Sequence, residues 1–210
     1  PLIADPRVAC VGGPVLEDDL VRRVPRDAGN VRWYGRRIGN VAGRISGPVR
    51  AVASAPEGNC AWRGDVLKQL TFAVELERPY PVHYGLDLGL QAAALGYTVV
   101  FEPKAAINHR PAPRAAGAES TDRAARTFDY SHNLAFVVAK HLPWWRRIAF
   151  LAWASAVGER SMYGPVRAAV AARRDPEAVR LVPATWRGLR AGYRAGRRRC
   201  AAETGGGATS

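Results

Sequence analysis

Lysine is nearly absent from this chain, and so are the motifs that identify several common enzyme classes. Lysine occurs only at positions 68, 104 and 140, so nearly all of the 31 basic residues are arginines. The sequence contains no P-loop, no GxSxG nucleophile elbow, no HExxH zinc motif and no dinucleotide-binding fingerprint. These absences argue against P-loop nucleotide hydrolysis, α/β-hydrolase chemistry, zincin proteolysis and Rossmann-type redox chemistry. No internal repeat is visible either.

Cysteines and long apolar runs are also scarce. Cys10, Cys60 and Cys200 are odd in number and far apart in sequence, with neither metal-ligand spacing nor an obvious disulfide framework, which favours a reducing compartment. The longest apolar run, 148–157, has about ten residues, whereas a membrane-spanning helix needs about twenty. The chain begins at Pro1 without an initiator Met or a signal peptide, on a segment typical of the approach to a strand, and we expect a fragment of a longer protein.

The net charge of +13 and the pI near 10.6 favour an anionic partner: nucleic acid, an anionic membrane face or a phosphate-bearing substrate. Residues 183–199 predict a basic amphipathic helix that fits an anionic lipid surface, although a solvated charged face explains the same pattern. Nucleic acid is the third interpretation. Because this segment lacks interleaved aromatic platforms or a reading motif, we expect no nucleic-acid partner.

The second half of the chain predicts helices. Amphipathic or apolar segments begin near Asp122 and cover 148–157 and 162–172, before the basic helix at 183–199. Trp144 and Trp145, beside two arginines, suit a membrane interface, but they suit a helix packed on the domain core equally well.

One stretch in the first half organises the rest: a loop and a helix from His83 to Gly96, followed by a strand over 97–101. Gly96 is typical of the residue that ends a helix, and the strand is β-branched and aromatic before Pro103. Asp87 is expected at the head of the helix, where a carboxylate satisfies free N–H groups.

The other expected elements are strands and one short helix. Strands are predicted over 7–11, 49–55 and 60–62, and a short helix over 65–70. The fold class is therefore α/β, with a mixed sheet and helices over residues 1–120, an amphipathic helical extension over 121–200 and a disordered tail over 201–210.

Five short sequence motifs, which we call stations, occur in the order found in the C-terminal part of the catalytic domain of family 2 glycosyltransferases, and the chain resembles that part. These enzymes have the GT-A fold. The resemblance covers roughly residues 5–115 and is greatest to bacterial, rhamnosyltransferase-like enzymes that build cell-surface polysaccharide. The stations are Val11-Gly12-Gly13, Gly58-Asn59-Cys60-Ala61-Trp62-Arg63, Leu86-Asp87-Leu88, the strand from Gly96 to Pro103, and the His-x-Pro-x-Pro-Arg exit from His109 to Arg114.

The resemblance implies inverting transfer of a sugar from a nucleotide-diphosphate sugar donor to a cell-envelope glycan or lipid-linked acceptor. The enzyme would work as a peripheral protein on the cytoplasmic face of the membrane. A carboxylate would act as general base on the acceptor hydroxyl, and Mg²⁺ or Mn²⁺ would stabilise the departing diphosphate. The candidate site residues are Asp87 as the catalytic carboxylate, Gly58, Asn59, Trp62, His83 and Tyr84 for substrate binding, and His109 for the metal.

Two departures from the family pattern matter. The donor-binding half, with its Asp-x-Asp motif, has no counterpart among these 210 residues. At the helix head, Gly85 stands where the base is expected and Tyr84 where another acid is usual. Either Asp87 or another acid replaces the base, with Glu75, Glu77 and Glu102 as candidates by sequence proximity, or the chain is a catalytically impaired, membrane-associated interaction domain of the same fold.

Overall fold

The computed structural model describes residues 2–16, 27–39, 47–110 and 122–205. Within them the chain is mixed α/β and divides into two compact units. The sheet unit comprises 1–32, 36–72 and 84–113, and the helical unit comprises 33–35, 73–83 and 114–210. The expected division near residue 120 is therefore too simple, because two short segments from the first half of the chain belong to the helical unit.

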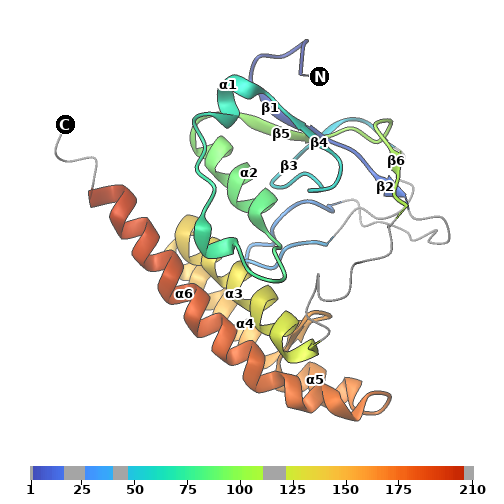
Figure 1. Cartoon of the computed structure of the whole chain (residues 1–210), viewed down its shortest axis with the longest axis vertical. Coiled ribbons are helices and arrows are strands. Elements are labelled where there is room, and N and C mark those ends of the chain that lie inside the picture. Colours follow the sequence, from blue (N-terminus) through green and yellow to red (C-terminus); the bar gives the residue numbers. More distant parts are fainter. Residues whose placement is uncertain (1, 17–26, 40–46, 111–121, 206–210) are drawn as a thin grey trace. The chain divides into compact units, whose positions relative to one another are not determined.

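The sheet unit is built on four short strands in the order β3-β5-β1-β4 (Figure 1). The central strand β1 pairs parallel to β5 and antiparallel to β4, and β5 pairs antiparallel to β3. A second, two-stranded sheet joins β2 and β6 in parallel. The bounds are Val8–Gly12 for β1, Val15–Leu16 for β2, Arg50–Val52 for β3, Cys60–Trp62 for β4, Thr98–Phe101 for β5 and Ile107–Asn108 for β6.

Helix α2 covers the sheet and is the longest helix of this unit among the described residues; α1 is a single turn. Their bounds are Gly64–Leu67 for α1 and Tyr84–Ala94 for α2. The side chains of Leu86, Leu88 and Ala92 are buried and form the inner face of α2. Gly96 ends the helix at φ +86, and the Tyr97 N–H donates back to the Ala92 carbonyl at 3.0 Å, as the sequence predicted for a helix-terminating glycine.

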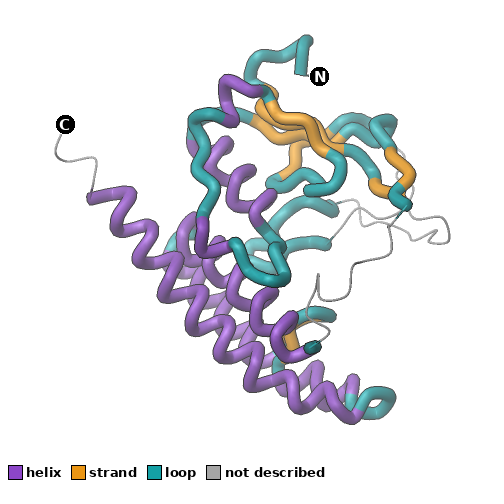
Figure 2. Tube along the Cα trace, in the orientation of Figure 1, coloured by secondary structure: helices purple, strands orange, loops and turns teal. Residues whose placement is uncertain are grey.

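The helical unit consists of three longer helices that lie side by side, with shorter elements around them (Figure 2). Helix α3 begins after Asp122, whose side chain accepts the Ala124 N–H at 2.8 Å and caps the helix. The bounds are Val74–Leu76 for η1, Arg123–His141 for α3, Trp144–Ala156 for α4, Gly158–Glu159 for β7, Met162–Tyr163 for β8, Pro165–Ala171 for α5, Pro176–Leu181 for η2 and Val182–Gly205 for α6. The predicted helix over 162–172 is thus shorter, since its first residues form a hairpin strand. The expected tail is helical as far as Gly205.

Three glycines spaced four residues apart bring α6 against α3. An added Cβ would lie 2.5 Å from the Phe128 carbonyl oxygen at Gly188, 2.0 Å from that of His132 at Gly192 and 2.4 Å from that of Phe136 at Gly196. Each distance is shorter than any side chain tolerates, so the α3 backbone occupies the space of the missing side chains. The glycine spacing therefore fixes the closest helix pair of the described structure.

Candidate active site

A carboxylate from a loop lies at the head of α2. The Gly85 N–H donates to Glu57 Oε1 at 3.0 Å, so Glu57 satisfies one of the free donors of the first helical turn. A Cβ built on Gly85 would lie 2.8 Å from Glu57 Cγ and 3.2 Å from Oε1. The Glu57 side chain therefore fills the volume that a side chain at position 85 would need.

The loop that carries Glu57 is fixed from both sides. At Gly12, an added Cβ would meet Ala55 and Pro56 at 2.7 Å, and at Gly89 it would meet the Ala53 carbonyl oxygen at 2.1 Å. The loop thus runs in contact with the end of β1 and with the buried face of α2. Because glycine alone permits both approaches, the sequence positions Glu57 through residues that carry no side chain.

Tyr84 and Cys60 lie close enough to Glu57 to sense its charge. Burial raises the pKa of Tyr84, and the negative charges of Glu57 and Cys60 raise it further. Hydrogen bonding to Cys10 lowers the pKa of Cys60 to about 7, against an opposing effect of burial and of Glu57. The same hydrogen bond and burial raise the pKa of Cys10. We call Glu57, Cys60, Tyr84 and Gly85 the α2-head cluster.

Asp87 lies at the head of α2, as the sequence predicted, but it is buried. The helix begins at Tyr84, Asp87 is the acid of its first turn, and the Asp87 side chain is 1% exposed. Gln91 Nε2 donates to Asp87 Oδ2 at 2.7 Å, and Gln91 also exchanges hydrogen bonds with the backbone of Thr71. Glu57, and not Asp87, accepts the Gly85 N–H at the helix head.

Asn59 joins three loops of the sheet unit. Its side-chain amide donates to the carbonyl oxygens of Pro14 at 3.0 Å and Ala105 at 2.7 Å, and its own carbonyl accepts the Gly13 N–H at 3.2 Å. Asn59, Gly13 and Ala105, with Cys60 and Val11, line an open and mainly apolar cavity of about 500 Å³. The structure thus brings the Val-Gly-Gly and Gly-Asn stations together at one cavity, with Asn59 fixing its rim.

The remaining predicted site residues have separate surroundings. Gly58 faces open space, and Trp62 packs between two small clusters of the sheet-unit core. His83 belongs to the helical unit: its side chain is fully buried, its backbone is in the left-handed region at φ 73, and its ring meets the edge of the Tyr130 ring at 4.5 Å. The contacts of His83 are therefore with the interior of the helical unit.

His109 follows β6 with an exposed side chain, and its N–H donates to the Leu16 carbonyl at 2.7 Å. Within the described residues, no three His, Cys, Asp or Glu side chains lie close enough together to hold a metal ion. The end of the His-x-Pro-x-Pro-Arg exit, 111–114, lies outside the described residues.

Glu57, which is 28 residues from Gly85, is not among the acids that the sequence suggested as a replacement base. Those three acids lie elsewhere: Glu75 and Glu77 belong to the helical unit, and Glu102 accepts the Lys104 N–H at 2.9 Å in the turn after β5. Comparison of the chain with protein-family models, with curated proteins and with solved structures gave no match.

Proposed function

We propose that the chain is the acceptor-side part of a GT-A-type glycosyltransferase, in which Glu57 acts as the general base. The observation that carries the proposal is the Glu57 carboxylate, which fills the space at Gly85 and accepts its N–H at 3.0 Å. The acid that the resemblance requires at the helix head is thus supplied from the loop after β3. The order and spacing of the sequence stations support the assignment.

In this proposal, Glu57 accepts the proton of an acceptor hydroxyl while that oxygen attacks the anomeric carbon of the donor sugar. The nucleotide diphosphate leaves from the opposite face, so the configuration is inverted. The Gly85 N–H holds one carboxylate oxygen and orients the group. Dependence on Mg²⁺ or Mn²⁺ remains an expectation from the resemblance, and no step is assigned to a metal here.

The proposal is tested on the protein expressed from its complete reading frame, because the Asp-x-Asp motif has no counterpart in these residues. Glu57→Gln should reduce transfer from nucleotide-diphosphate sugars by about 10²–10⁴-fold. The matched control is Glu102→Gln, which removes a carboxylate of the same unit and should retain activity. Full activity in Glu57→Gln would remove Glu57 as base. Absence of nucleotide-sugar binding in the wild type, with or without Mg²⁺ or Mn²⁺, would favour the impaired interaction domain.

We further propose that the helical unit attaches this enzyme to an anionic membrane surface. Four large apolar side chains are exposed beside the start of α4: Trp33 is 64% exposed, Trp144 70%, Trp145 48% and Ile148 58%. The exposure of both tryptophans excludes the core interpretation of this pair. We call these four residues the α4 apolar patch.

Trp33 belongs to this patch through defined contacts. Arg146 Nε donates to the Trp33 carbonyl at 2.7 Å, and the Tyr34 ring lies 5.3 Å from the Trp153 ring. A Cβ on Gly35 would meet Phe150 at 2.8 Å, so the segment 33–35 lies directly on α4. Tryptophan prefers the headgroup region of a bilayer, where its ring is partly apolar and partly hydrated.

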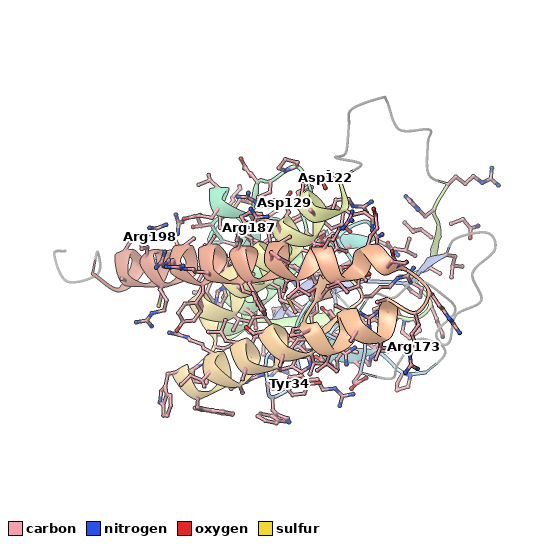
Figure 3. The ribbon with its side chains drawn as sticks, turned by 90° about the horizontal axis from the view of Figure 1, so that it is seen from below. Tyr34, Asp122, Asp129, Arg173, Arg187 and Arg198 are labelled. Atoms are coloured by element: carbon pink, nitrogen blue, oxygen red, sulfur yellow. The ribbon has the colours of Figure 1, made fainter. Side chains whose placement is uncertain are left out.

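A groove between α4 and α6 offers the second feature that suits lipid. It has a volume of about 570 Å³ and combines the apolar side chains of Leu151, Leu189 and Trp186 with Arg190 and Arg194. Helix α6 carries further arginines along its length, including Arg187 and Arg198 (Figure 3). Apolar contact beside cationic side chains is the combination that binds anionic lipid surfaces. Among the described residues, no helix is both long enough and apolar enough to cross a bilayer.

Vesicle sedimentation tests the attachment. The double change Trp144→Ala and Trp145→Ala should weaken binding to anionic vesicles while leaving helix content unchanged, since neither ring is in the core. The control is the double change Val166→Ala and Val170→Ala, at two exposed residues of α5. Equal loss in both variants, or binding to duplex DNA with a stronger salt dependence than to vesicles, would contradict the membrane assignment.

A further inference from the structure

The helical unit contains a second cavity whose wall is strongly cationic. Its volume is about 330 Å³, and Arg123, Arg126 and Arg160 all line it. Arg123 and Arg126 come from the first turns of α3, while Arg160 comes from the turn between β7 and β8. Two separate elements therefore direct three guanidinium groups at one space, and no carboxylate is among its described lining residues.

One of the three arginines is held in place by acids. Arg123 makes two hydrogen bonds to the Asp175 carboxylate, at 2.5 and 3.2 Å, and lies 3.8 Å from Glu177. This pairing lowers the pKa of Asp175, so the carboxylate is ionised at neutral pH. Arg123 is thus a neutralised and fixed part of the wall.

The other two arginines retain their charge at the cavity. The Arg126 guanidinium stacks over the Tyr80 ring at 4.8 Å, which orients it without neutralising it. Among the residues that the structure describes, neither Arg126 nor Arg160 forms an ion pair with a carboxylate. Two positive charges in a concave site are unfavourable to each other unless an anion is bound between them.

Arg123 and Arg126 lie in the first turn of α3, and the carboxylate at this end of the helix is that of the capping residue Asp122, which accepts the Ala124 N–H at 2.8 Å. Because Asp122 offsets the partial positive charge of the helix N-terminus, the case for an anion rests on the guanidinium groups and not on the helix dipole.

Hydroxyl groups complete the wall. Thr127, Ser161 and Tyr163, which carry hydroxyl groups, line the same cavity. Guanidinium groups bind phosphate oxygens in pairs, and hydroxyls donate to the remaining oxygens. We propose that this pocket binds a diphosphate group, with Arg126 and Arg160 as its principal contacts and Arg123 as a fixed support. The proposal stands apart from the glycosyltransferase assignment, since it rests on the helical unit alone.

Calorimetric titration of the chain with inorganic pyrophosphate tests the pocket. The wild type should bind in a saturable, one-to-one manner. The double change Arg126→Gln and Arg160→Gln should raise the dissociation constant for pyrophosphate by about tenfold or more, because charge-assisted contacts are lost. The matched control is Arg173→Gln with Arg174→Gln, two exposed arginines in the turn after α5, of which Figure 3 labels Arg173.

Because the control removes the same charge, it should change binding less than twofold. Equal weakening in both variants would show that pyrophosphate responds only to net charge and would overturn the proposal, as would the absence of saturable binding in the wild type. Circular dichroism on each variant verifies that the helices remain folded. A change of Arg123 is not used, since it would break the contact with Asp175.

The source of the diphosphate is decided with vesicles of phosphatidylcholine containing a minor fraction of a polyprenyl diphosphate. If the pocket takes a lipid headgroup, the added lipid should increase vesicle binding, and both pyrophosphate and the Arg126/Arg160 change should abolish the increase. If the pocket takes a free anion, pyrophosphate binds as above while the added lipid gives no increase sensitive to Arg126 and Arg160. An increase that survives the double change would contradict the pocket as the diphosphate site.

Discussion

The sheet unit and the helical unit both rely on glycine, but they use it for different purposes. In the sheet unit, Gly12 and Gly89 let one loop approach a strand and a helix closely, and that loop carries Glu57. In the helical unit, Gly188, Gly192 and Gly196 let two long helices meet along their backbones. The first arrangement positions the proposed general base, whereas the second joins the two longest helices of the described structure. Changes at the two sets of glycines should therefore have different consequences.

The largest effect is expected at the centre of the helix pair. Gly192→Ala places a Cβ 2.0 Å from the His132 carbonyl oxygen, so α3 and α6 must separate. We expect a loss of about 3 kcal/mol or more in the free energy of unfolding, at the upper end of the cost of overpacking. Chemical denaturation followed by circular dichroism measures it. Gly64→Ala, where an added Cβ meets nothing within 4 Å, is the control and should be nearly neutral.

A smaller effect is expected at Gly89 of the sheet unit. Gly89→Ala brings a Cβ to 2.1 Å from the Ala53 carbonyl oxygen, and a loop yields more easily than a second helix. We expect the free energy of unfolding to fall by about 1–3 kcal/mol. Transferase activity should fall by more than the loss of folded protein explains, because the loop positions Glu57. Activity that follows stability in strict proportion would show that Glu57 tolerates displacement.

The pair Cys10 and Cys60 sharpens the description of the sheet unit. Alkylation of Cys60 should increase with pH around a midpoint near 7, because hydrogen bonding to Cys10 stabilises the thiolate. In Cys10→Ala the midpoint should move up toward the ordinary value of 9.0. Mass spectrometry of peptides labelled with iodoacetamide, in a Cys200→Ser background, measures this. An unchanged midpoint would mean that Cys10 does not act on Cys60.

The smallest effect is the pH response of the helical unit. Burial lowers the pKa of His132 below 6.5, and the charge of Arg78 lowers it further. Just below that pH, His132 is protonated in the unfolded chain but is still neutral in the folded chain. The contribution of His132 to the free energy of unfolding should therefore be constant well above pH 6.5 and decrease as the pH falls through that value. His132→Gln should reduce this decrease in urea denaturation series, and an unchanged slope would contradict the assignment.

Local features were predictable from the sequence because neighbouring residues determine them. Gly96 ends α2, strand β5 runs over Thr98–Phe101, and the α/β class with its mixed sheet is confirmed. The contact of Glu57 with Gly85 was not predictable, since no local pattern links residues so far apart along the chain. The four-residue spacing of Gly188, Gly192 and Gly196 is present in the sequence, but the arginines between these glycines indicate a charged helix face more strongly than the glycines indicate a packed one.

Exposure was equally hard to predict. The Trp144–Trp145 pair fits a core or a membrane interface equally well in sequence, and packing alone decides that both rings remain exposed. The helix predicted over 162–172 failed at its start because Met162 and Tyr163 pair with Gly158 and Glu159. A hairpin of that length has too few residues to show an alternating pattern.

The most direct test of the central claim moves the carboxylate from position 57 to position 85. In the protein expressed from its complete reading frame, Glu57→Gly should abolish most transfer, and adding Gly85→Glu should restore it, because the two side chains compete for one volume. Recovery to within about tenfold of the wild-type rate is the predicted result, given the 10²–10⁴-fold contribution of a general base. A double variant as inactive as Glu57→Gly, with nucleotide-sugar binding and stability intact, would contradict the assignment of the base to the head of α2.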